Sequence, residues 1–282
     1  MKEDIFKGRT LLLVTKHGKE SVMKEILESE LGVNVVVSED FDTDKFGTFS
    51  GEVKRDGNQL EAARKKLLSG MKHYGATLGV GSEGSFGSLP NNPLMPLNTE
   101  LVVLIDQDNN IEIKGHHSTF NTNSSGESVS SYEEALEFAE RIGFPLHGVI
   151  LRKTKDDKKM YKGIISYDDL EKYFRQLQTW YRKKVYIETD LRAHMNPKRM
   201  TAIGKATSDL VKNSLSKCEK CFSPGFSAVD VKKGLVCQLC DLPTDLISKY
   251  IFKCQKCAFT KLTDRPDALL KADAGDCAHC NP

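Results

Sequence analysis

The four stretches 218-CEKC-221, 237-CQLC-240, 254-CQKC-257 and 277-CAHC-280 decide the fold of the C-terminal part of this chain. They contain all eight of its cysteines. A CxxC pair can place two thiolates on one metal from a tight turn, and a second pair about 15 to 20 residues further on completes a tetrahedral site of four thiolates. The pattern therefore predicts two structural zinc ions. A disulfide framework and an iron–sulfur site are the alternatives.

The eight cysteines can be shared between two zinc ions sequentially or in an interleaved, cross-braced way. There are 15 residues between Cys221 and Cys237 and 19 between Cys257 and Cys277, so each half already has the loop length of a zinc ribbon. We therefore prefer the sequential pairing. Its two sites consist of the first four cysteines, Cys218, Cys221, Cys237 and Cys240, and of the last four, Cys254, Cys257, Cys277 and Cys280.

The zinc segment is expected to be structural. Four thiolates fill every zinc position, which leaves no place for a catalytic water. Residues 218–282 hold nine basic and eight acidic side chains, and eight thiolates with two Zn²⁺ bring their formal charge to −3. Binding to nucleic acid normally requires a basic excess, so this balance disfavours nucleic acid as a partner without excluding it. The metals would replace a hydrophobic core too small to fold alone.

The rest of the chain has the composition of a globular protein, with 39% hydrophobic residues overall. Its longest aliphatic runs, Leu11 to Val14 and Leu101 to Ile105, are too short to span a membrane. The polar start Met1-Lys2-Glu3-Asp4 does not resemble a secretory signal. We therefore expect no membrane partner and a reducing, cytoplasmic location.

Hydrophobic periodicity predicts an α/β fold with a mixed sheet at residues 1–165, a helical connector with a charged loop at 166–215, and tandem zinc ribbons at 216–282. The expected strands are 9–14, 33–37, 77–81, 100–106, 111–117, 147–153 and 161–166. The expected helices are 20–30, 58–74, 132–142, 166–182 and 196–217. Residues 82–87, 89–98 and 121–131 are expected to be loops, because they are rich in Gly, Pro, Asn and Ser.

Charge is segregated along the chain. Residues 1–140 carry 14 basic and 23 acidic side chains, whereas residues 141–200 carry 15 basic and 7 acidic ones. These blocks are either solvated faces or a basic rim over an acidic metal site. The second arrangement would suit an anionic small molecule such as a nucleotide.

Three short stretches of the N-terminal block carry residues suited to phosphate chemistry. The turn Thr15-Lys16-His17-Gly18-Lys19 precedes a helix, where backbone N–H groups favour an anion and Lys19 adds a charge. Glu61 on the second helix and Glu83 among glycines are candidates to hold Mg²⁺. The alternative is that Glu61 is an ordinary exposed helical residue.

In order along the chain, LLLVTKHGKE at 11–20, the ExAxxK pattern at 61–66 and VGSEGS at 80–85 resemble the inosine- and xanthosine-triphosphate pyrophosphatases. The resemblance covers residues 10 to about 150. It implies that Lys19 binds phosphate and that Glu61 and Glu83 hold Mg²⁺, so that water can attack between the α- and β-phosphates. His17 stands where that family has Asn, and that family has no counterpart of the cysteine tail.

The whole chain also resembles a bacterial family with no assigned activity, which carries a GSEGSFG segment, an ETDLRAHMNP segment and a terminal CNP. The second segment, residues 188–197, is extended by Lys198 and Arg199 and includes Arg192 and His194. With His17, these two are the candidate ligand-binding residues. The segment either completes a site or is a charged loop in which Asn196 caps the next helix.

Two classes of function follow from these observations. The first is an Mg²⁺-dependent hydrolase of a nucleoside triphosphate or another phosphorylated small molecule. The second is a non-catalytic zinc-ribbon protein that binds a ligand, a protein or a nucleic acid. The sequence lacks GxxxxGK[ST], GxSxG and HExxH motifs, which disfavours P-loop ATPases, serine hydrolases and zinc proteases. Whether the protein is an enzyme, and its oligomeric state, stay open at this point.

Overall fold

The computed structural model describes residues 5–41, 57–89, 92–181 and 184–282. The chain forms a larger mixed α/β unit that ends at Val211 and a smaller unit, Lys212–Pro282, with two clusters of cysteines. Among the described residues, no helix combines the length and the apolar character needed to cross a bilayer.

A five-stranded mixed sheet forms the first layer of the larger unit, in the order β2-β1-β3-β4-β5. β1 (Thr10–Val14) is parallel to both β2 (Asn34–Val37) and β3 (Leu78–Leu89). Parallel neighbours need a crossover connection, and the helices α1 (Glu20–Leu31) and α2 (Gln59–Tyr74) supply it. β4 (Asn92–Asp106) and β5 (Ile111–Thr119) are antiparallel and form the expected hairpin. The predicted β-α-β start is confirmed.

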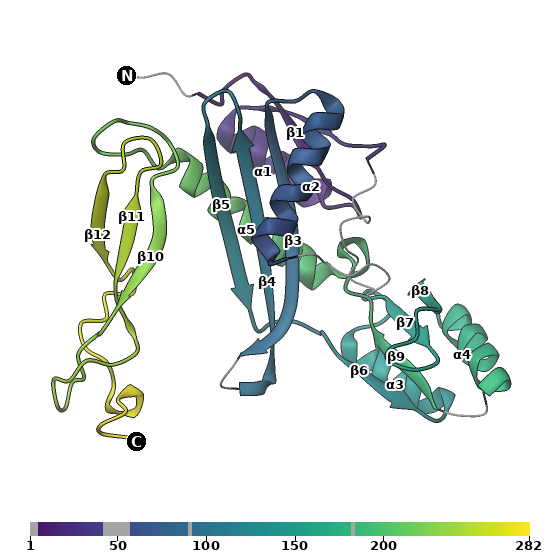
Figure 1. Ribbon diagram of the computed structural model, residues 1–282. Helices are drawn as coiled ribbons and strands as arrows, with labels where there is room; N and C mark the ends of the chain where they lie inside the picture. Colours follow the sequence, from purple (N-terminus) through teal and green to yellow (C-terminus); the bar gives the residue numbers. More distant parts are fainter. Residues whose placement is uncertain (1–4, 42–56, 90–91, 182–183) are drawn as a thin grey trace. The chain divides into compact units, whose positions relative to one another are not determined.

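Helices cover both faces of this sheet (Figure 1). On one face, Leu27 of α1 and Ile203 of α5 (Pro197–Leu215) pack with Val80, Val102 and Leu104. On the other face, Leu67 and Met71 of α2 pack with Val14 and Val103. Because successive residues of a strand point to opposite faces, a strand buried on both sides is apolar at every position. This explains the continuous run Leu101–Ile105.

The expected loops at 82–87 and 89–98 are wrong for the residues that the structure describes, because β3 continues to Leu89 and β4 begins at Asn92, and the two strands form a long hairpin. Residues 90–91 lie outside the described part of the chain. The glycines of 81–87 lie in the strand, and Gly81 and Gly84 admit close neighbours. Pro96 pairs with Ser88 in a part of β4 that β5 does not reach, since the β4–β5 register ends at the Asn98↔Thr119 pair. A proline is tolerated there because that side of the strand is an edge.

A second, antiparallel sheet has the order β6-β9-β7-β8. Its strands are β6 (Gly126–Val129), β7 (Val149–Arg152), β8 (Met160–Ile164) and β9 (Val185–Thr189). The helices α3 (Tyr132–Ile142) and α4 (Tyr167–Tyr181) share one hydrophobic core with it. β9 was not expected, and the expected loop at 121–131 is wrong at β6. The expected connector, 166–215, thus contributes α4 and β9 to this sheet and α5 to the first one.

The smaller unit is built on three antiparallel strands in the order β10-β11-β12. They are β10 (Ser227–Lys233), β11 (Ile247–Lys253) and β12 (Thr260–Asp264). One CxxC pair precedes β10, and one follows each strand in turn. Each strand therefore carries the chain from one end of the sheet to the other. The first and third pairs meet at one end, and the second and fourth at the opposite end.

Packing of α5 on the first sheet depends on Gly115, which faces Val102 across the β4–β5 ladder. A Cβ atom at this position would lie 2.1 Å from the backbone N of Leu210 and 2.5 Å from the carbonyl O of Ala206. We expect Gly115→Ala to destabilise the larger unit by about 1 to 3 kcal/mol, because the helix backbone must move away from the sheet. Urea unfolding of the full chain measures this change.

Gly87→Ala in β3 is the matched control, because no atom lies within 4 Å of its added Cβ and its φ is not positive. Its free energy of unfolding should stay within about 0.5 kcal/mol of the wild type. Equal unfolding free energies for the two variants would contradict the close approach of α5.

Candidate functional site

The structure gathers the eight cysteines into two groups of four, and within each group the Sγ atoms lie within 4.8 Å of one another. The first group combines Cys218 and Cys221 with Cys254 and Cys257. The second combines Cys237 and Cys240 with Cys277 and Cys280. The preferred sequential pairing is therefore wrong, and the sites are interleaved. The sites are interleaved because one strand lies between each CxxC pair and the next, so successive pairs lie at opposite ends of the sheet.

All eight cysteines have free thiols. Within the first group, the Sγ–Sγ distances between cysteines of different CxxC pairs are 3.7 and 3.5 Å, and within the second group they are 3.9 and 3.7 Å. Four sulfurs about 2.3 Å from a central zinc ion lie about 3.8 Å apart at the corners of a tetrahedron. The donor set and its spacing thus suit a zinc ion in each group.

The backbone repeats one geometry at all four CxxC turns. The N–H group of the residue after the second cysteine donates to the carbonyl of the first cysteine at Phe222, Asp241, Ala258 and Asn281, with distances of 2.8, 3.1, 3.0 and 2.8 Å. Lys220 and Leu239 also donate their N–H groups to the Sγ of Cys218 and Cys237, at 3.4 Å each. These bonds hold each pair of thiolates ready for one metal.

The larger unit contains a cluster of buried charges beside Lys19. The turn before α1 places His17 and Gly18 at φ values of 68° and 75°, and the chain then enters the helix at Lys19. The Lys19 side chain extends inward, is only 7% exposed, and donates from Nζ to the Oγ of Ser82 at 3.0 Å. An ammonium group is thus enclosed with a hydroxyl as its hydrogen-bond partner.

Glu83 lies next to Ser82 on β3, so its side chain points to the opposite face of the sheet. There it is buried and forms an ion pair with Lys66 of α2. The expectation that Glu83 lies in a loop is corrected, because it is part of β3. Its carboxylate is already neutralised by a buried cation in this arrangement.

A second buried ion pair closes the cluster on the face of α5. Arg199 donates from Nε to Glu100 Oε1 at 2.8 Å, and both side chains are almost fully buried. Arg199 Nη1 also donates to the carbonyl O of Leu191 at 2.6 Å. A Cβ atom at Gly84 would come within 2.5 Å of Arg199 Nη2 and 2.6 Å of Glu100 Oε1, so only glycine leaves room for this pair.

Lys66, Glu100 and Arg199 were not singled out by the sequence analysis, although Arg199 closes the charged segment 188–199. Each reaches its partner from a distant element, and no local pattern reveals such a contact. The available signal was the position of Glu100, a charged residue directly before the apolar run Leu101–Ile105 of β4.

Among the described residues, the charges that act on Lys19 are those of Arg199, Lys66, Glu100 and Glu83. Burial lowers the pKa of Lys19 to about 7, and the positive charges of Arg199 and Lys66 add to this effect. Glu100 and Glu83 act in the opposite direction but do not compensate. A negative charge placed next to Lys19 would therefore favour its protonated form.

Glu61 takes part in a different interaction. Its backbone N–H donates to Asn58 Oδ1 and its Oε2 accepts from the Asn58 N–H, both at 3.0 Å, which is a capping box at the start of α2. Its side chain is exposed. Within the described part of the chain, neither Glu61 nor Glu83 belongs to a group of three or more metal-ligating side chains. Their role as Mg²⁺ ligands stays a prediction.

The three other candidate residues lie around the segment before α5. The imidazoles of His17 and His194 stack with ring centroids 5.0 Å apart, and His194 belongs to the short 3-10 helix η2 (Ala193–Met195). Burial lowers the pKa of His194, and the nearby Arg192 adds to this shift. This stack joins the turn before α1 to the segment before α5. His17 is two residues before Lys19, and His194 lies against Gly18, the residue just before Lys19.

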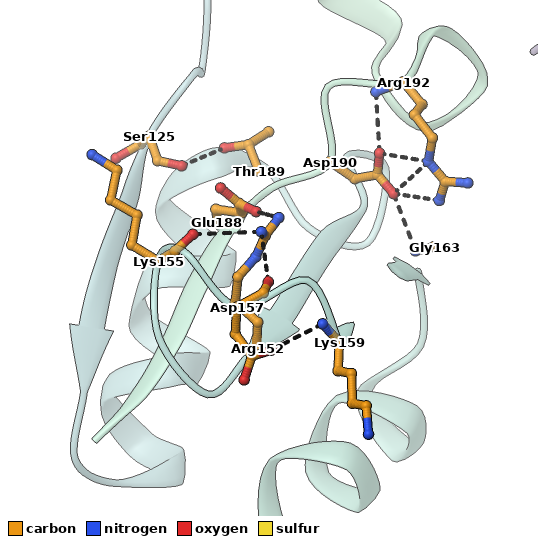
Figure 2. A network of polar contacts seen from close by, with 10 residues as sticks. All are labelled: Ser125, Arg152, Lys155, Asp157, Lys159, Gly163, Glu188, Thr189, Asp190 and Arg192. Carbon is orange, nitrogen blue, oxygen red and sulfur yellow. Dashed lines mark hydrogen bonds and ion pairs between the residues drawn. The ribbon is translucent and has the colours of Figure 1, made fainter. Parts of the chain in front are cut away.

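Arg192 is held by a network on the second sheet (Figure 2). It donates from Nη2 to Asp190 Oδ2 at 2.6 Å, and the same carboxylate accepts the N–H of Gly163 at 3.1 Å. In the same network Arg152 pairs with Glu188, whose pKa is raised by burial. Asp190 thus links β8 to the segment before α5 and holds Arg192, whose contact with a ligand stays a prediction.

The fold and these sites define an α/β protein with two C-terminal four-cysteine centres. Residues 66–282 match the family described as a domain of unknown function, DUF6671, and the chain belongs to this family. No curated protein and no solved structure matches it. The resemblance to the inosine- and xanthosine-triphosphate pyrophosphatases has no support from these comparisons.

The interleaved pairing predicts how paired cysteine substitutions divide the bound metal. Cys221→Ser with Cys254→Ser removes two ligands from one centre, so about one metal ion per chain should remain. Cys221→Ser with Cys240→Ser damages both centres, so the chain should lose both ions. Elemental analysis of the purified variants measures the metal content. The opposite order of the two variants would restore the sequential pairing.

The buried position of Lys19 predicts a dependence of stability on pH. Lys19 binds a proton with a pKa of about 7 in the native state and 10.5 when unperturbed, so the unfolded chain holds more protons between these values. The free energy of unfolding should therefore rise with pH across this window. Lys19→Met removes this contribution. The free energy of unfolding of Lys19→Met minus that of the wild type should be highest below about pH 7 and should fall by up to about 5 kcal/mol towards pH 10.5.

Urea unfolding of the wild type and of Lys19→Met from about pH 6 to about pH 10 measures this difference. Lys24→Met, on the exposed side of the same helix, is the control and should show a difference from the wild type that does not change over this range. If the Lys19→Met difference were equally constant, Lys19 would be solvated rather than buried.

Proposed function

We propose that the larger unit binds the phosphate group of a phosphorylated small molecule at Lys19 and hydrolyses a phosphoanhydride bond of that molecule. The observation that carries this proposal is the buried ammonium of Lys19. Among the described residues, its Nζ contacts Ser82 Oγ, and no ion pair with a carboxylate satisfies it. A phosphate oxygen would supply the missing negative charge.

The position of Lys19 in the fold supports this proposal. It follows the carboxyl end of β1, where ligands of open α/β sheets commonly bind, and it precedes the N-terminus of α1, whose N–H groups favour anions. The pairing of β1 with β3 ends at Val14↔Gly81, whereas β3 continues to Leu89. The edge of β3 next to Ser82 is therefore not covered by β1.

The residues of this cluster suit the charge changes of phosphoanhydride hydrolysis. An arriving phosphate would favour the protonated form of Lys19, and the charged ammonium would then stabilise the negative charge that develops on the phosphate oxygens. Arg199 and Lys66 are held at fixed positions by their ion pairs with Glu100 and Glu83, which oppose their positive charges.

The expected Mg²⁺ ligands do not fit a metal site as they are arranged here. Glu83 is paired with Lys66, and Glu61 completes the capping box of α2. The proposal therefore derives no step from Mg²⁺, and metal dependence is a question for the assay. The same observation favours a second candidate function, a protein that binds the phosphorylated ligand without turnover.

For the smaller unit, we propose that each four-cysteine group holds a structural zinc ion. All four positions of each tetrahedron are occupied by thiolates, so no position is open for a reacting water. The centres would stabilise the three-stranded sheet, which has few buried side chains of its own.

Calorimetric titration of the full chain with pyrophosphate, ATP and ITP tests the binding step. We expect Lys19→Met to weaken binding by about 100-fold, corresponding to about 3 kcal/mol for a lost charge-assisted hydrogen bond. Lys24→Met keeps α1 and removes an exposed charge, so it should bind as the wild type does. Equal affinity of Lys19→Met and the wild type for every ligand would refute the site.

A release assay for phosphate and pyrophosphate, with Mg²⁺, with Mn²⁺ and without added metal, distinguishes the two candidate functions. Turnover by the wild type that Lys19→Met loses would support the hydrolase. Ligand binding without turnover of inosine, xanthosine or ordinary triphosphates would support the binding protein instead.

A further inference from the structure

The two ends of the three-stranded unit are built alike but differ in their exposed side chains. At the third position of the CxxC turns, the first centre carries Lys220 and Lys256, whereas the second carries Leu239 and His279. The same backbone bonds hold Lys220 and Leu239, each through an N–H group to a cysteine Sγ. The fold thus accepts a lysine at this position and does not require a leucine.

Large aliphatic side chains nevertheless gather at the second centre. Leu239 is 72% exposed and Leu270 is 85% exposed. Three more exposed residues, Val236, Leu242 and Leu269, belong to the same two segments of the chain. We call these five residues the apolar end.

Backbone bonds keep the two segments of the apolar end side by side. The N–H of Ala272 donates to the carbonyl of Val236 at 2.8 Å, and the N–H of Gln238 donates to the carbonyl of Ala272 at 2.9 Å. Lys271 forms an ion pair with Asp241 at 2.7 Å. The cysteine turn also fixes Leu242, whose carbonyl accepts the N–H of Cys237 at 2.8 Å. The exposed leucines are therefore presented from ordered backbone, which lowers the entropy cost of binding.

Acidic residues outnumber basic ones in the two segments that form the apolar end. Residues 234–246 and 265–282 contain five aspartates and two basic residues. The aspartates are Asp241, Asp245, Asp267, Asp273 and Asp276. By contrast, residues 216–226 and 253–259 at the first centre contain four lysines and one glutamate. Four thiolates around one Zn²⁺ add two negative charges at each end, so the apolar end is the strongly acidic one.

We propose that the apolar end is a docking surface for a basic amphipathic segment of a partner protein. Exposed aliphatic residues that the fold does not require indicate an interaction site, and the acidic excess selects lysine- or arginine-rich partners. Nucleic acid is excluded as an occupant by the negative charge of this end. A second copy of this chain is the alternative that the test must separate.

The experiment uses the metal-loaded full chain and a labelled helical peptide made of leucine and lysine. Leu239→Lys with Leu270→Lys should weaken binding of this peptide at least 10-fold. The control, Val229→Lys with Leu262→Lys, changes two exposed residues of β10 and β12 and adds the same charge. It should change the affinity less than twofold. Metal analysis of both variants confirms that the centres remain filled.

Three results would overturn the proposal. The first is equal weakening of peptide binding by the two double variants, which would indicate a general effect of charge. The second is equally tight binding of a peptide in which glutamate replaces lysine. The third is wild-type self-association in sedimentation that Leu239→Lys with Leu270→Lys abolishes, because the occupant would then be a second copy.

Discussion

The buried ion pair between Arg199 and Glu100 is the interaction on which the larger unit depends most. It ties the start of α5 to the middle of β4, and through Leu191 it also anchors the segment before that helix. Removing one partner of such a pair typically costs about 3 to 5 kcal/mol, since the other charge stays buried. The pair requires glycine at position 84 and brings a permanent positive charge near Lys19. One contact therefore sets the packing of α5 and the electrostatics of the candidate phosphate site.

In the smaller unit, metal ligation and the sheet depend on each other. Every strand connects one four-cysteine centre to the other, so the first centre forms when β10 and β11 are paired and the second when β11 and β12 are paired. Conversely, the strands bury few side chains and are held together at both ends by the cysteines. Structural zinc contributes on the order of 10 kcal/mol to the folding of small modules, which is enough to offset a core of this size. The two ends can therefore carry different exposed residues without loss of the fold.

Features that depend on neighbouring residues could be predicted from the sequence, and features that depend on distant partners could not. The expected helices 58–74 and 132–142 are confirmed, and the structure shows Asn58 and Ser131 as their N-caps. The length of β3 was underestimated because glycines close to a helix or an ion pair look like loop residues. β9 was missed because its length is set by pairing with β6 and β7. Cysteine spacing predicted two four-thiolate sites but not their members, since the spacing does not show that a strand crosses the unit between successive pairs.

The charge segregation along the sequence has a different meaning once the contacts are known. Arg199, from the basic block, neutralises Glu100, from the acidic block, inside the protein. Arg192 and Arg152 pair with carboxylates of their own block, Asp190 and Glu188. These three guanidinium groups are thus engaged by carboxylates of the fold. Among the described residues, Lys19 is a buried cation without an ion pair, and its Nζ donates to Ser82 Oγ. A single buried lysine can favour a ligand where a basic surface does not, because salt screens it little and an arriving anion would favour its protonated form.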